Sequence, residues 1–384
     1  MRKYKSKPRR ACARVSFGVV LSIVLLFVIS LTNDFIFGGL ALHEAIPHFN
    51  YDVNRRFSQT LNGEAYEEIN VWPIFSRPTR ARRENAHVVN SNPDVVGISA
   101  VTFEPKTEYQ NVEAARMFAP RQLTMDTSAF TDLNSLRTRM YTVNPCTAMS
   151  YADFNVERFM SKSMTIDSDA AQRGEPIVLI FHTHSTEMFV DSNPGDKFTG
   201  IVGVGAYLTQ VLNEMGIPTM HMTNRWDIVN GQSMIRGAYE RQEADIRRVL
   251  EQYPSIEIII DLHRDGLPPG APKLLTYIDG RPTAQIMFFN GLSQLNVNGA
   301  LTPITGLPNP NLPYNLAFSF QMQLAANEMH PGFTRRIFLR AYRFSLHFLP
   351  RSLLVEVGAQ NNTFEEAINA MRPLAEVLAN IILD

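Results

Sequence analysis

Apolar residues in the C-terminal part of the chain form two kinds of segment, short continuous runs and longer stretches with helical spacing. Continuous runs with β-branched residues indicate strands that are covered on both faces, and they occur at residues 176–181, 256–262, 284–289 and 353–357. Stretches of helical length occur at residues 201–215, 234–253, 315–329 and 364–383. Strands that alternate with such helices predict an α/β fold with a mainly parallel sheet and helices on both faces.

The N-terminal residues predict a membrane anchor. Val15–Leu31 is a stretch of seventeen residues without a charge, and a basic stretch precedes it. The positive-inside rule keeps residues 1–14 in the cytoplasm and places the C-terminal bulk outside. We therefore expect a single-pass protein of the cell membrane, with the anchor at residues 15–34, an extracytoplasmic and partly structured spacer at 35–150, and the α/β domain at 151–384. A cleavable signal peptide is the alternative, although no small-x-small cleavage site follows Leu31.

Composition limits the class of function. The 384 residues include 36 Lys+Arg and 37 Asp+Glu, which argues against a protein that coats nucleic acid. Residues 1–14 carry seven cations and no acid, so the remaining 370 residues carry a net charge of −8. The 2 Cys, Cys12 and Cys146, exclude a Cys-rich zinc module and a disulfide scaffold.

Polar segments follow three of the predicted strands. Residues 182–187 (HTHSTE) follow the first strand, residues 263–265 (HRD) follow the second, and Glu356 lies near the end of the fourth. Binding sites of open α/β sheets form outside the carboxyl ends of the strands, so we expect these residues to lie together. Three of the 9 His in the chain fall in these segments, which favours a metal site.

The donor types in these segments suit zinc. A catalytic zinc site uses three protein ligands, often imidazole and carboxylate, and keeps a fourth position for water. His184 and Glu187 would supply two ligands that are close in sequence, and His263 would supply a distant third. Glu356 is the candidate general base, because a carboxylate on an otherwise apolar strand is costly to bury without a partner or a task.

Each residue also has an ordinary structural interpretation. His182 or His184 can be a hydrogen-bonded loop histidine, and His182 remains an alternative ligand or an outer-shell residue. His263 and Asp265 can bond loop amides and water, and Asp265 is a second alternative ligand. Glu356 can pair with a nearby arginine. The conjunction of three polar clusters at strand ends favours the metal site over these separate explanations.

Four motifs in a fixed order resemble a known family. They are VLIFHTHSTE at 178–187, IIDLHRD at 259–265, AQIMFFNG at 284–291 and LLVEVG at 353–358. These segments are similar to those of the stage II sporulation protein P family, membrane-anchored cell-wall hydrolases of endospore-forming bacteria. The resemblance covers roughly residues 150–384, and the residues before it match only in their arrangement.

That family resembles the zinc-dependent N-acetylmuramoyl-L-alanine amidases. The likeness implies an amidase-like fold, zinc ligands at His184 and His263, and a catalytic glutamate at Glu356. The ligand glutamate of those amidases lies on the helix after a long loop. Here residues 201–213 carry no acid, so Glu187 must take its place.

The resemblance also implies an activity and partners. The activity is zinc-dependent cleavage of the amide between N-acetylmuramic acid and L-alanine, and endopeptidase cutting of cross-links is also attributed to the family. Arg264 would help to bind peptide carboxylates or the oxyanion. The family acts in septal thinning and engulfment, with the lytic transglycosylase stage II sporulation protein D and the membrane protein stage II sporulation protein M. An inactive peptidoglycan-binding scaffold and a zinc peptidase of similar fold are the alternatives.

Overall fold

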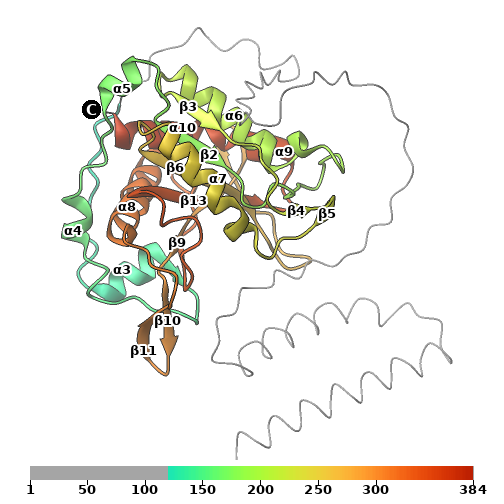
Figure 1. Cartoon of the computed structure of the whole chain (residues 1–384). Coiled ribbons are helices and arrows are strands. Elements are labelled where there is room, and N and C mark those ends of the chain that lie inside the picture. Colours follow the sequence, from blue (N-terminus) through green and yellow to red (C-terminus); the bar gives the residue numbers. More distant parts are fainter. Residues whose placement is uncertain (1–119, 384) are drawn as a thin grey trace, which may run out of the picture. The chain divides into compact units, whose positions relative to one another are not determined.

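The computed structural model describes residues 120–383, which form a seven-stranded sheet with helices on both faces (Figure 1). The predicted basic tip, the anchor and most of the predicted spacer lie outside these residues. Within residues 120–383, no helix has both the length and the apolar character needed to cross a bilayer. The membrane anchor therefore stays a prediction.

The order of strands across the sheet is β1 (Tyr141–Val143), β12 (Ile337–Arg340), β9 (Ile286–Gly291), β13 (Arg351–Ala359), β6 (Ile258–Asp265), β2 (Val178–Phe181) and β3 (Thr219–His221). Every neighbouring pair is parallel except β9 and β13, which are antiparallel. The predicted α/β fold with a mainly parallel sheet is thus confirmed. The edge strand β1 belongs to the segment that we expected to be spacer.

The antiparallel pair has a simple cause in the connection between β6 and β9. Parallel neighbours require a crossover of a dozen or more residues, usually with a helix. Residues 266–285 contain instead the hairpin of β7 (Leu275–Ile278) and β8 (Arg281–Ala284). The chain therefore enters β9 at the edge of the sheet where it left β6. As a result, the amino ends of β9 and β12 lie beside the carboxyl ends of β6 and β13.

The larger helices agree with the predicted apolar stretches. They are α6 (Ile201–Glu214), α7 (Ala238–Gln252), α8 (Leu312–Met329), α9 (Phe364–Asn369) and α10 (Met371–Ile382), and shorter elements are α3 (Leu133–Met140), α4 (Val156–Met160), α5 (Ser168–Gln172) and the 3-10 turn η1 (Lys197–Thr199). The single helix expected at 364–383 is divided in two. Pro373 explains the division, because its ring would clash with the carbonyl of Asn369 in a continuous helix.

Alternate residues of the central strands pack on opposite faces. In β2, Val178 and Ile180 belong to the larger core, which contains α6, α8 and α10. Leu179 and Phe181 belong to a second core with Ala238, Ile246 and Val249 of α7. The period of two is the side-chain alternation of a strand, and both faces are buried because helices cover both.

Two further hairpins lie outside the main sheet. They are β4 (Ile228–Val229) with β5 (Gln232–Ser233), and β10 (Gln294–Val297) with β11 (Ala300–Pro303), which projects from the body in Figure 1. Their strands are only two to four residues long, which is too short for an apolar pattern to mark them in the sequence.

Helix α6 approaches the sheet closely at Gly205. A Cβ at this position would lie 2.5 Å from Cε1 and Nε2 of the buried His182 ring and 3.0 Å from Nε2 of His221. The missing side chain thus makes room for two imidazoles beneath the helix.

We expect Gly205→Ala to lower the free energy of unfolding by about 1 kcal/mol. Overpacking costs about 1–3 kcal/mol, which outweighs a helix-propensity gain of about 1 kcal/mol. Urea denaturation measures the change, with Glu251→Ala on the exposed part of α7 as the control. An unchanged or raised stability for Gly205→Ala would contradict this close packing.

Candidate functional site

The turn after β2 is fixed by a buried carboxylate from another segment. Asp227 is fully buried, and its Oδ1 accepts a hydrogen bond from Oγ of Ser185 at 2.6 Å. Its Oδ2 accepts from the backbone N–H of Thr186 at 2.8 Å. The carbonyl of Glu187 in turn accepts from the N–H of Ile201, at the start of α6. These bonds give residues 182–187 a defined conformation.

The two histidines of this turn lie in different surroundings. His182 is fully buried beneath α6, where its Nδ1 lies 2.8 Å from the carbonyl of Leu262 and its Nε2 lies 2.8 Å from Nε2 of His221. Burial lowers the pKa of His182 to about 4, so the ring is neutral. Both ring nitrogens of His182 are thus engaged on the face of the sheet that α6 covers.

His184 lies on the side of the site that α7 covers. Its ring meets Tyr239 and His263 edge to face, with centroid distances of 5.6 and 5.2 Å. Burial, followed by the nearby His263, lowers the pKa of His184. Its Nδ1 is buried and has no hydrogen-bond partner among residues 120–383. This nitrogen is thus available to a ligand.

His263 and Asp261 point to the same face because they are two apart on β6. Nε2 of His263 lies 2.7 Å from Oδ1 of Asp261. The same carboxylate accepts hydrogen bonds from the N–H of Thr183 at 2.9 Å and from Oγ of Ser345 at 2.7 Å. Burial alone would raise the pKa of Asp261, but His263 and Thr183 lower it to about 2. A carboxylate–histidine pair of this kind commonly orients a metal-ligating imidazole.

Glu187 lies on the other side of the His263 ring. Its Oε2 accepts a hydrogen bond from the N–H of Arg264 at 2.9 Å and lies 3.5 Å from Nδ1 of His263. Burial opposes its ionisation, yet the charges of His263 and Arg264 lower its pKa. Burial also opposes the charge of His263, but Asp261 and Glu187 raise the pKa of that ring well above its usual value.

Glu356 lies next to His263 on the neighbouring strand of the sheet. The two residues are register partners in the parallel pair of β13 and β6, so their side chains point to the same face. Its Oε2 is buried and has no hydrogen-bond partner in the described part of the chain. Burial, followed by the charge of Asp265, raises the pKa of Glu356 to about 8. A glutamate with such a pKa is mostly protonated at pH 7 in the zinc-free protein, and it can accept a proton once it is ionised.

Asp265 and Arg264 have other partners. Oδ2 of Asp265 forms a salt bridge at 2.8 Å with Nη1 of Arg335, which precedes β12. Nε and Nη2 of Arg335 are buried without a hydrogen-bond partner among the described residues. Nε of Arg264 donates to the carbonyl of Met188 at 2.9 Å. The role of Arg264 in substrate binding stays a prediction, and Arg335 is a second guanidinium at the same edge.

The predicted ligands partly fit a zinc ion. Among residues 120–383, no three His, Cys, Asp or Glu side chains already stand as a group that could hold a metal. The 3.5 Å between Oε2 of Glu187 and Nδ1 of His263, however, is close to the ligand–ligand distance of about 3.4 Å that metal–ligand bonds of about 2.1 Å require in a tetrahedron. The His184 ring lies next to the His263 ring, with centroids 5.2 Å apart, and its Nδ1 has no partner among the described residues. The chemistry of the three donors, two imidazoles and a carboxylate, suits zinc.

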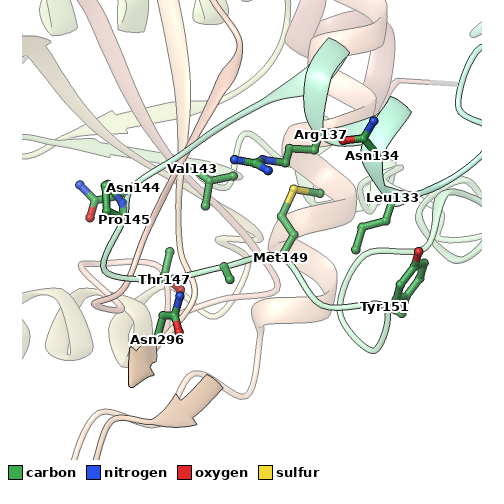
Figure 2. Close-up of a pocket in the computed structure, with 11 residues that line it drawn as sticks. Leu133, Asn134, Arg137, Val143, Asn144, Pro145, Thr147, Met149, Tyr151 and Asn296 are labelled. Carbon is green, nitrogen blue, oxygen red and sulfur yellow. The ribbon is translucent and has the colours of Figure 1, made fainter. Parts of the chain in front are cut away.

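A pocket among the described residues lies away from the candidate site. It has a volume of about 550 Å³, and residues of α3, β1, the loop that follows β1, and Asn296 line it (Figure 2). None of the predicted ligands or the predicted base belongs to this lining. The candidate site is thus defined by its polar groups and not by this pocket.

Sequence reasoning missed several residues of the site. Asp261 could have been found from its spacing of two from His263 on an otherwise apolar strand. Asp227, Tyr239 and Arg335 carry no local signal, because they come from segments that only the fold brings to this edge.

Comparison with solved structures finds amidases at low similarity. The N-acetylmuramoyl-L-alanine amidase AmiC2 of Nostoc punctiforme is 14% identical, and the match covers 54% of this chain and 95% of that chain with a TM-score of 0.31. The CwlD amidase of Clostridioides difficile, solved in complex with the GerS lipoprotein, is 12% identical, with coverage of 53% and 95% and a TM-score of 0.33.

Comparison of sequences identifies the family. Stage II sporulation protein P of Bacillus subtilis (strain 168) is 22% identical over 240 residues, and the match covers 56% of this chain. The chain spans only about half of that relative, because the match covers 56% of its length. The family of stage II sporulation protein P (SpoIIP) matches residues 103–379. Because this match extends over more than half of the chain, and confirms the resemblance of the four motifs, the chain belongs to the stage II sporulation protein P family.

Proposed function

We propose that this chain is a zinc-dependent peptidoglycan hydrolase that cleaves the amide between N-acetylmuramic acid and L-alanine. The observation that carries the proposal is the gathering of His184, Glu187, His263 and Glu356 at one edge of the sheet. Two of their polar atoms, Nδ1 of His184 and Oε2 of Glu356, are buried without a hydrogen-bond partner in the described part of the chain. Membership of the stage II sporulation protein P family supports the same reaction, through the resemblance of that family to cell-wall amidases.

Each residue has a separate task in this mechanism. His184, Glu187 and His263 would hold the zinc ion, which when bound polarises the scissile carbonyl and makes the attacking water more acidic. Asp261 pairs with Nε2 of His263 and so leaves Nδ1 directed toward Glu187. Glu356 would accept a proton from the water and return it to the nitrogen of the departing L-alanine amine. Cleavage then gives a free carboxylate on the sugar and a free amine on the peptide.

The place of action is part of the proposal. The basic tip and the uncharged segment Val15–Leu31 would anchor the chain in the cell membrane with its C-terminal domain outside, where peptidoglycan lies. The work would be thinning of septal peptidoglycan and engulfment during sporulation. Stage II sporulation proteins D and M are the partners that the resemblance suggests. Cutting of peptide cross-links is a second activity that the resemblance suggests for the same site.

We expect a chelator to abolish release of peptides from peptidoglycan sacculi, and added zinc to restore it. Mass spectrometry of the soluble products should find peptides with a free L-alanine amine, whereas an endopeptidase would leave the bond between sugar and peptide intact. Activity that survives complete removal of metal, as judged by elemental analysis, would exclude the zinc mechanism.

We expect His184→Ala to lose bound zinc, while His182→Gln keeps about one zinc per chain and loses thermal stability instead. The reason is that His182 lies beneath α6 with both ring nitrogens engaged, whereas Nδ1 of His184 is unpartnered. Elemental analysis and thermal unfolding of both variants measure the two effects. Loss of zinc from His182→Gln but not from His184→Ala would reverse the assignment.

We expect Glu356→Gln to lower kcat at least about 100-fold, because the amide cannot carry the proton. Zinc content and thermal stability should stay close to those of the wild type, since the amide keeps the shape of the side chain. Glu251→Gln, at an exposed position of α7, is the control. A wild-type kcat in Glu356→Gln would contradict the assignment of Glu356 as the general base.

A further inference from the structure

Tyr239 is held in the site by its ring. It is the second residue of α7, directly after Ala238, and Gly237 precedes the helix with a φ of +79°. One edge-to-face contact joins its ring to His184, and another joins it to Phe344 at 5.4 Å and 75°. Phe344 packs in turn on Phe289 at 4.7 Å and 82°. The phenol therefore has aromatic support on both sides, which limits the movement of its ring.

The hydroxyl of Tyr239 is differently placed from the other polar groups. Burial raises the pKa of Tyr239 well above its usual value, and the charges of Asp261, Glu356 and Glu187 act in the same direction. The side chain is half-buried, and its hydroxyl has no hydrogen-bond partner among residues 120–383. Oε2 of Glu356 is buried from solvent without a partner, whereas the hydroxyl of Tyr239 does not belong to the buried polar atoms without a partner. It is thus a donor that a bound molecule can reach.

Neighbouring polar groups are already committed to other bonds. The carboxylate of Asp261 accepts from Thr183 and Ser345, and Oε2 of Glu187 accepts from the N–H of Arg264. Nε of Arg264 donates to a backbone carbonyl. A neutral phenol in such a place keeps its proton near neutral pH, because the unperturbed pKa of tyrosine is about 10. The unpartnered Oε2 of Glu356 and Nδ1 of His184 have tasks of their own in the proposed mechanism, so the substrate would supply the acceptor for this proton.

We propose that the Tyr239 hydroxyl donates a hydrogen bond to the carbonyl oxygen of the scissile amide. This inference rests on the proposed function, and it assigns a substrate contact to a residue that sequence reasoning did not select. The carbonyl oxygen gains negative charge as water adds to the carbon, so a fixed donor stabilises the transition state more than the bound substrate. Tyr239 would thus act beside the predicted ligand His184, while Glu356 transfers the proton.

Tyr239→Phe tests this role, because it removes the hydroxyl and keeps the ring on His184. We expect kcat on sacculi to fall about 100-fold, as for loss of one donor to a developing oxyanion. KM and zinc content should stay within about twofold of the wild type, and the melting temperature should stay within a few degrees. The reason is that a hydroxyl without a protein partner contributes little to these quantities. Tyr277→Phe is the matched control, since this tyrosine is 68% exposed on the β7–β8 hairpin.

Binding to the zinc-free protein gives a second readout. Isothermal titration of the full chain with N-acetylmuramoyl-L-alanyl-D-isoglutamine should show affinities within about twofold of the wild type in both Tyr239→Phe and Tyr277→Phe, because the donor acts mainly on the charge that develops in the transition state. A wild-type kcat in Tyr239→Phe would overturn the role of Tyr239 and would leave the proposed function unaffected. A loss of zinc and of thermal stability together with activity would also overturn it. The lower activity would then result from a disturbed ring contact with His184 and not from the missing hydrogen bond. An inactive wild type with full zinc would overturn the proposed function itself.

Discussion

The carboxylate of Asp261 joins three distant segments of the chain at one edge of the sheet. It pairs with His263 on its own strand, accepts two hydrogen bonds from Thr183 in the turn after β2, and accepts one from Ser345 in the loop before β13. An isolated buried charge would be costly, and removal of one partner of a buried pair typically costs about 3–5 kcal/mol. The turn that carries His184 and the strand that carries His263 are thus tied to each other by this residue, in addition to the pairing of β2 with β6 and the bond from the N–H of Arg264 to Glu187.

The direction of β9 decides what else reaches this edge. Because no helix lies between β6 and β9, β9 runs back against β13, and the amino ends of β9 and β12 lie beside the carboxyl ends of β6 and β13. Arg335, just before β12, reaches Asp265 across this edge. A fully parallel sheet would have placed Arg335 at the opposite end. The salt bridge therefore depends on the one antiparallel pair in the sheet.

Several of the buried polar atoms without a hydrogen-bond partner lie where the chemistry is proposed, and others lie elsewhere in residues 120–383. Nδ1 of His184, Oε2 of Glu356 and two nitrogens of Arg335 are buried without a partner among residues 120–383. A buried group of this kind costs about 1–3 kcal/mol, and a cluster of such groups is expected at a functional site rather than in a packing core. The burial that costs stability also raises the pKa of Glu356 to about 8, which suits proton transfer. The core on both faces of the sheet, with β2 buried residue by residue, supplies the stability that offsets this cost.

The sequence by itself determined the four apolar strands, the large helices, the fold class and the four polar residues near strand ends. Burial on two faces and helical periodicity both produce patterns among neighbouring residues, and such patterns can be recognised without the tertiary structure. Spacing placed His263 and Glu356 near the ends of their strands, but it did not show that the two are register partners. Only the tertiary structure separated His182 from His184, since the chain turns after Phe181 and sends the first ring beneath α6 at Gly205. Only the tertiary structure, likewise, brought Asp227, Tyr239 and Arg335 to the site. Their positions depend on contacts between segments far apart in the chain, and such contacts leave no periodic signal in any one of them.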